Sequence, residues 1–147
     1  MKELGLTMLS IFLAVLLYPA PTVAEDVDPA GTWQATRSNS NTEGPCPMGG
    51  DGGGELTINK TDGGLTLIYG KGFKCSPTKV CRLEGSEAEG THTFTTTVPV
   101  DNEGGTVTND AEIKFTSASS ATGKGSSKYS HPSGFTCTWT FDLSLSR

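Results

Sequence analysis

The segment FTCTWTFDLSLS, which spans residues 135–146, alternates apolar and polar side chains without a break. Its apolar positions are Phe135, Cys137, Trp139, Phe141, Leu143 and Leu145. Successive side chains of a β-strand point to opposite faces, so a period of two predicts a strand with one face toward a core. The intervening Thr, Ser and Asp side chains suit a face toward water. This final segment therefore predicts a half-buried strand.

Earlier stretches of the chain show the same alternation between short connections rich in Gly, Asp, Ser and Pro. They are residues 31–37, 55–59, 65–70, 79–84, 91–98, 106–115 and 121–129. None of the connections is long enough for a crossover helix, so successive strands should be antiparallel neighbours. An even number of strands lets the first pair with the last, which removes both exposed edges. We expect an all-β, antiparallel up-and-down eight-stranded barrel, with a β-sandwich as the alternative.

The amino terminus predicts export. A nearly uncharged apolar run over residues 4–18 follows Lys2, and the small residues Thr22 and Ala24 come just before Glu25. This run is short for a membrane span, and the small residues fit a cleavage site, so residues 1–24 are expected to be a signal peptide. A retained anchor is the alternative. Residues 25–147 then form a single secreted or periplasmic domain, with no stable membrane insertion after cleavage.

Net charge excludes one class of partner. The 147 residues carry a formal charge of −5, and removal of residues 1–24 takes away one basic and one acidic residue, so the charge is unchanged. Nucleic-acid binding needs a basic stripe that displaces counterions, so no nucleic-acid partner is expected. The span between Arg82 and Lys114 holds acidic residues and no Lys or Arg. We interpret it as a solvated face, with a docking patch as the alternative.

The four cysteines all lie after the predicted leader. An even number in an exported chain predicts two disulfides, for which three connectivities exist. Alternating strand directions bring the loop at 38–54 and the loop at 71–78 to one end of the barrel. Cys46 lies in the first loop and Cys137 starts the last strand, and these strands are neighbours only if the barrel closes. The topology therefore predicts Cys46–Cys137 and Cys75–Cys81 disulfides, with a zinc site as a weaker alternative because the spacing does not fit.

A short motif opens the first predicted strand. Gly31-Thr32-Trp33 follows Asp28-Pro29-Ala30, and the last strand returns to the same end and finishes at Arg147. A G-x-W opening of an eight-stranded exported barrel resembles the calycin superfamily of lipocalin-like and avidin-like barrels, and also occurs in similarly shaped bacterial metalloprotease inhibitors. In lipocalins, this Trp closes one end of the barrel and a basic residue covers it. The resemblance implies that Arg147 packs across Trp33.

The predicted function is a lipocalin-like binding module for a small apolar ligand that enters at the cysteine-bearing end. The candidate ligand-binding residues are Trp33, Tyr69, Phe94, Phe115, Tyr129, Trp139 and Phe141. Further inward positions are Ala35, Leu56, Ile58, Ile113 and either Leu67 or Ile68. An eight-stranded barrel either fills with side chains or holds one small ligand. The alternative is therefore a filled barrel that acts as an envelope, inhibitory or adhesive protein-interaction module, in which Trp139 and Phe141 occupy the space left by Gly123 and Gly125.

Catalysis is not expected. The chain lacks a nucleophile-elbow, zinc-protease, Walker or dinucleotide motif. His92 and His131 fall at opposite ends of the expected barrel, so neither a shared metal nor an acid–base pair is predicted. We therefore expect no cofactor and no metal.

Overall fold

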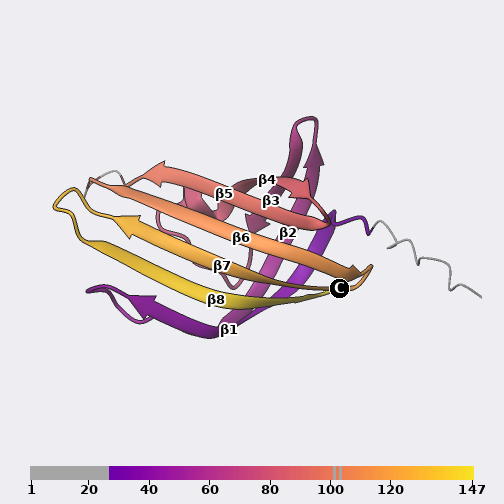
Figure 1. The fold of residues 1–147 in the computed structure, drawn as a ribbon, viewed down its shortest axis with the longest axis horizontal. Coiled ribbons are helices and arrows are strands. Elements are labelled where there is room, and N and C mark those ends of the chain that lie inside the picture. The colour runs from indigo at the N-terminus through magenta and orange to yellow at the C-terminus, as the bar shows by residue number, and fades with distance from the viewer. Residues whose placement is uncertain (1–26, 101, 103) are drawn as a thin grey trace, which may run out of the picture.

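A computed structural model describes residues 27–147 apart from 101 and 103, so the predicted signal peptide lies outside the described residues. Eight antiparallel strands form a closed barrel (Figure 1). They are β1 (Gly31–Glu43), β2 (Gly52–Thr61), β3 (Gly64–Tyr69), β4 (Arg82–Ala88), β5 (Thr91–Pro99), β6 (Thr106–Ser117), β7 (Ser120–Ser130) and β8 (Thr136–Ser146). One 3-10 helix, η1 (Thr78–Cys81), precedes β4.

Each strand pairs with the next in sequence, and β1 pairs with β8 to close the sheet. Gln34 lies opposite Ser146 at one end of this seam, and Thr42 lies opposite Trp139 near the other end. The expected up-and-down barrel is confirmed, and the β-sandwich alternative is wrong. Closure pairs the strand edges that a sandwich would leave open.

Strand β1 is longer than predicted, and the loop that follows it is shorter. It continues past Arg37 to Glu43 because its second half pairs with β8, after an irregularity between Ser38 and Asn41. Strand β2 begins at Gly52 rather than residue 55, since the glycine run pairs with β1. The connection between them therefore covers 44–51 rather than 38–54.

Both ends of β4 and the start of β8 also differ from the prediction. Residues 79–81 lie in η1 rather than in a strand, because Val80 turns inward and is 2% exposed. Strand β4 extends to Ala88, since Glu89 and Gly90 make a tight turn with φ of 52° and 74°. Phe135 lies outside β8, where it is 40% exposed and stacks on His131 at 4.5 Å between ring centroids.

Side chains fill the interior of the barrel. Those exposed by less than 2% include Trp33, Leu56, Ile58, Leu67, Leu83, Phe94, Ile113 and Leu143. Leu67 rather than Ile68 therefore points into the core. Two aromatic rings cover glycines on the neighbouring strand: Phe94 covers Gly85, and Phe141 covers Gly125. Such pairs compensate for the missing side chain of a strand glycine.

Trp33 and Arg147 close one end of the barrel. The Arg147 guanidinium carbon lies 4.1 Å from the centroid of the indole ring. Arg147 donates hydrogen bonds to the carbonyls of Asp28, Ala30 and Ala118, and the indole Nε1 donates to Pro29 O at 2.9 Å. The predicted cover of Trp33 by Arg147 is confirmed. Figure 1 shows the carboxyl terminus at the end of the barrel where β1 begins.

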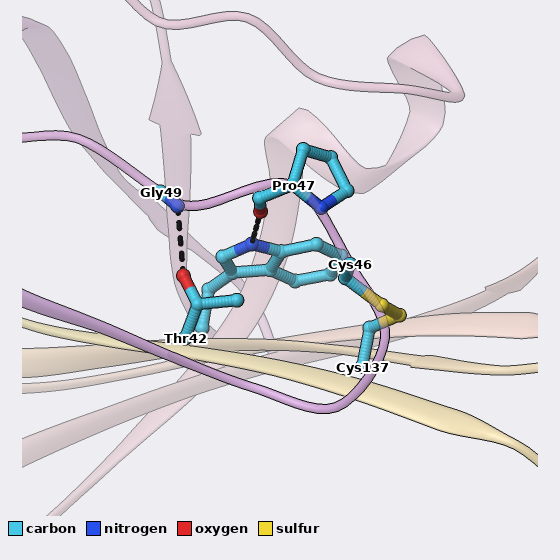
Figure 2. Close-up of a disulfide and its surroundings, with 6 residues drawn as sticks. Thr42, Cys46, Pro47, Gly49 and Cys137 are labelled. Atoms are coloured by element: carbon cyan, nitrogen blue, oxygen red, sulfur yellow. Dashed lines mark hydrogen bonds between the residues drawn. A yellow bond between two sulfur atoms is a disulfide. The ribbon is translucent and has the colours of Figure 1, made fainter.

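Both predicted disulfides are present, and both lie at the opposite end. The Cα atoms of Cys46 and Cys137 are 5.9 Å apart, and those of Cys75 and Cys81 are 5.6 Å apart. Figure 2 shows the first bridge and the connection that it anchors. This connection covers Trp139, whose indole Nε1 donates to Pro47 O at 2.9 Å.

Candidate ligand-binding site at the open end

A loop held by the second disulfide enters the open end of the barrel. Phe73, which precedes the bridge, packs edge-on against Tyr69 with 4.9 Å between ring centroids. Within η1, the carbonyl of Val80 accepts a hydrogen bond from Asn109 Nδ2 at 2.9 Å. Asn109 lies two residues from the inward-facing Val107 and Ala111 of β6, so this bond ties the loop to the barrel interior.

Between this loop and the core lies a cavity of about 90 Å³. Its lining residues are Arg37, Tyr69, Phe73, Lys74, Cys75, Asn109, Ser126, Ser127 and Phe141. Pockets for drug-sized molecules are larger, at roughly 300–1,000 Å³. The cavity is therefore large enough for a head group of a few atoms, while the rest of a larger ligand would extend outward.

Arg37 is an unusual residue for this position. It follows Trp33 and Ala35 in the inward phase of β1, so the strand carries a cation into the mouth of the barrel. The guanidinium carbon lies 5.5 Å from the Phe73 ring centroid and 5.4 Å from the Phe141 ring centroid. Both distances are in the range of cation–π interactions.

Two polar atoms of this cavity have no partner. Arg37 Nε and Asn109 Oδ1 are both buried and make no hydrogen bond with the described residues. Arg37 also forms no ion pair within 4.0 Å in the part of the chain that the structure describes. Buried polar groups are usually paired, and an unpaired buried donor or acceptor costs free energy. Two residues that line the cavity therefore carry an unpaired donor and an unpaired acceptor.

Tyr69 adds a neutral hydroxyl to the same cavity. Burial raises the pKa of its phenol from 10.0 to about 12, and Arg37 opposes this effect more weakly. The phenol therefore stays protonated at neutral pH and keeps a hydrogen to donate.

The structure brings together only part of the predicted ligand-binding set. Tyr69 and Phe141 line the cavity. Trp33 and Phe94 are fully packed in the core, and Phe115 contacts Trp33 at the closed end with 5.1 Å between centroids.

The other two predicted residues lie at the open end but outside the cavity lining. Tyr129 packs near His131 and Phe135, each with 6.0 Å between ring centroids. Trp139 lies beneath the connection 44–51, where a side chain on Gly49 would collide with the indole.

Most residues of the cavity were not in the predicted set, among them Arg37, Phe73 and Asn109. Arg37 and Asn109 continue the inward phase of their strands, so the alternation alone could have identified both as inward polar residues. Phe73 lies in a loop with no periodicity. Only its closeness to Cys75 in the sequence could have indicated a role in the site, because a short disulfide holds a loop in one conformation.

A wider groove lies on the outer face of the sheet and has a volume of about 800 Å³. Its acidic lining residues are Glu84, Asp110, Glu112 and Asp142, and its basic one is Lys124. Three of the carboxylates already have partners. Thr95 Oγ1 donates to Asp110 at 2.6 Å, Asn39 Nδ2 donates to Asp142 at 2.7 Å, and Arg82 pairs with Glu84 at 3.1 Å.

The histidines lie apart, as the topology predicts. His92 is buried near the closed end, 3.5 Å from Glu87, and His131 lies in the connection before β8. Among the described residues, no group of three or more His, Cys, Asp or Glu side chains is placed to hold a metal ion. Within the same residues, no helix is long and apolar enough to cross a membrane.

Comparisons with known proteins leave the site to be interpreted from its geometry. No protein-family model matches the chain, and searches of curated proteins and of solved structures find no significant match. The class that the structure itself defines is an all-β protein with a closed eight-stranded antiparallel barrel.

Proposed function

We propose that the protein is a calycin-like binding module that takes up a small ligand at the open end of its barrel. The observation that supports this most directly is the 90 Å³ cavity, which combines aromatic walls with unpaired polar atoms at the mouth of an otherwise packed barrel. Ligand sites are commonly apolar concavities with a few well-placed polar groups. The proposal is one of binding rather than catalysis.

The packed core limits how the ligand binds. Trp33, Phe94 and Ile113 fill the interior below the cavity, so a lipocalin-sized ligand would find no space at that depth. Tyr69, Phe73 and Phe141 instead offer aromatic surface near the opening. A ligand with one compact polar end and a short apolar part fits this arrangement.

The two disulfides support a secreted or periplasmic location for this activity. Disulfides persist in oxidising compartments, and both bridges stiffen the end of the barrel that carries the cavity. A loop held in place before binding loses less conformational entropy when the ligand arrives.

Native mass spectrometry of protein purified from its own source tests the proposal. We expect a retained small-molecule mass on the wild-type protein. The mass should be lost in Phe73→Ala, which removes one wall, and kept in Phe135→Ala, an exposed aromatic outside the cavity. An unliganded wild-type protein that also fails to bind six-carbon alcohols, acids and amines in calorimetry would contradict the proposal.

The second candidate function is protein interaction through the outer groove of about 800 Å³. Its excess of carboxylates favours a basic partner, although three of the four are already engaged within the chain. Titration with hexalysine at low and moderate salt distinguishes the two functions. Salt-sensitive binding that disappears in Glu112→Gln and persists in Arg37→Met would favour the groove.

A further inference from the structure

We propose that the open-end cavity recognises a carboxylate, and that Arg37 holds this group while Asn109 accepts a hydrogen bond from a hydroxyl on the adjacent carbon. The ligand class is therefore a short 2-hydroxycarboxylic acid with an apolar tail. This inference rests on the proposed function and specifies the chemistry of the same site.

The need for an anion comes from Arg37. Its buried Nε makes no hydrogen bond, and the guanidinium forms no ion pair in the described part of the chain. Phe73 and Phe141 contact the cation but offer ring faces, which leave in-plane donors unused. Arg37 is half-buried, and its buried Nε is an unpaired donor, which is unfavourable; an anion that supplies an acceptor removes this penalty.

The surrounding charges favour an anion over a cation. Lys74 also lines the cavity and adds a second positive charge. The pKa of Asp51 is lowered mainly by hydrogen bonds from Ser40 and only weakly by Arg37, so this carboxylate is already engaged. Asp110 influences Tyr69 least among the causes of its raised pKa, and its carboxylate accepts from Thr95 instead.

A carboxylate fits better than a larger anion. Its two oxygens match the planar fork of a guanidinium, whereas the acceptor oxygens of a tetrahedral phosphate point in several directions and need donors on several sides. The small volume of the cavity suits a carboxylate and its neighbouring carbon. The neutral Tyr69 hydroxyl can donate to the same anion.

The hydroxyl preference comes from Asn109. Because its Nδ2 donates to Val80 O, the side chain is oriented and its Oδ1 is left as the unpaired acceptor. An anion alone cannot satisfy an acceptor. A hydroxyl beside the carboxylate supplies the missing donor, and leaving such a group unpaired weakens binding.

Isothermal titration calorimetry of the chain without residues 1–24 tests this recognition with four six-carbon probes and inorganic phosphate. The probes are hexan-1-ol, hexanoate, 2-hydroxyhexanoate and hexylammonium. We expect hexanoate to bind at least about 10-fold more tightly than hexan-1-ol, because a charge-assisted hydrogen bond is stronger than a neutral one. We expect 2-hydroxyhexanoate to gain about a further 5-fold over hexanoate, and hexylammonium to bind most weakly.

Variants assign the selectivity to single residues. In Arg37→Met, hexanoate and hexan-1-ol should bind equally, whereas Arg37→Lys should keep part of the preference. In Asn109→Leu, the 5-fold gain from the hydroxyl should disappear while the preference for the acid stays. Arg82→Met, which changes an exposed arginine on β4, serves as the matched control and should leave all affinities unchanged.

Each outcome has a separate meaning. Equal binding of hexan-1-ol and hexanoate by the wild-type protein would overturn the carboxylate inference and leave the proposed function standing. Tighter binding of phosphate than of hexanoate would also overturn it. Failure of every probe to bind would contradict both the inference and the proposed function.

Discussion

The two ends of the barrel place an arginine on aromatic rings in different ways. At the closed end, Arg147 covers Trp33 at 4.1 Å and donates to three backbone carbonyls. At the open end, Arg37 lies near two phenylalanine rings, and its buried Nε donates to no described residue. A cation whose three nitrogens each donate to the backbone stabilises the fold, while one with an unpaired buried N–H is available to bind a ligand.

The ends also differ in how the chain is held. Hydrogen bonds and packing around Trp33 close one end, whereas both disulfides lie at the other. Covalent bonds can hold loops in place around polar groups that would not fold together unaided. This difference predicts that the two ends respond differently to mutation.

Removal of the Cys46–Cys137 disulfide should have the largest effect on stability. The bridge spans 91 residues, and loss of this constraint on the unfolded chain costs about 4–5 kcal/mol in the chain-entropy model. The Cys75–Cys81 bridge spans 6 residues and should cost about 2 kcal/mol. Urea unfolding of the two Cys→Ala pairs measures both values. Equal losses would show that the bridges act mainly on the native open end rather than on the unfolded chain.

The next largest effect should be a difference in stability between variants of the two arginines. Arg147→Met removes a cation–π contact and three charge-assisted hydrogen bonds, and should lower the free energy of unfolding by about 2–3 kcal/mol. Arg37→Met removes a cation without a partner and should change it by less than about 1 kcal/mol, in either direction. Urea midpoints of both variants give the comparison. A large loss of unfolding free energy in Arg37→Met would show that Arg37 stabilises the fold, and the two ends would then not differ in this respect.

The architecture could be predicted from the sequence because it depends on patterns of residues that recur along the chain. Alternation placed the strands, and an even strand number together with turn-length connections implied closure. Closure in turn brought Cys46 beside Cys137. Each step needed only backbone geometry and the preference of apolar side chains for the interior.

The site could be predicted only in part, because it depends on a loop. Tyr69 and Phe141 were expected to face inward, and they do line the cavity. Phe73 and η1 follow no period, since their positions come from the disulfide and from tertiary contacts such as Asn109 with Val80. Aromatic residues also packed the core more completely than a ligand-holding barrel would allow, as Trp33 and Phe94 show.

The two glycine–aromatic pairs should show a smaller difference in stability between the core and the open end. A Cβ on Gly85 would collide with the buried Phe94 ring, and one on Gly125 would collide with the Phe141 ring. Gly85→Ala should cost about 2 kcal/mol because Phe94 has no room to move, and Gly125→Ala about 1 kcal/mol because Phe141 can shift outward. Thermal unfolding measures both. Gly125→Ala alone should also weaken hexanoate binding, and unchanged binding would place Phe141 outside the site.

The smallest effect is a pH response confined to the open end. The pKa of Tyr69 is raised by burial from 10.0 to about 12, so the folded protein holds this proton more tightly than the unfolded chain does. The resulting contribution to stability is complete below pH 10 and is lost as the pH rises from 10 to 12. Phenolate absorbance should therefore show a late-titrating tyrosine that disappears in Tyr69→Phe. Arg37→Met should delay this titration further, because Arg37 lowers the pKa of the phenol, whereas Arg147→Met should leave it unchanged as long as the protein stays folded. Ionisation of Tyr69 near pH 10 in the folded protein would show that the phenol is hydrated, and the cavity would then lose one of its donors to water.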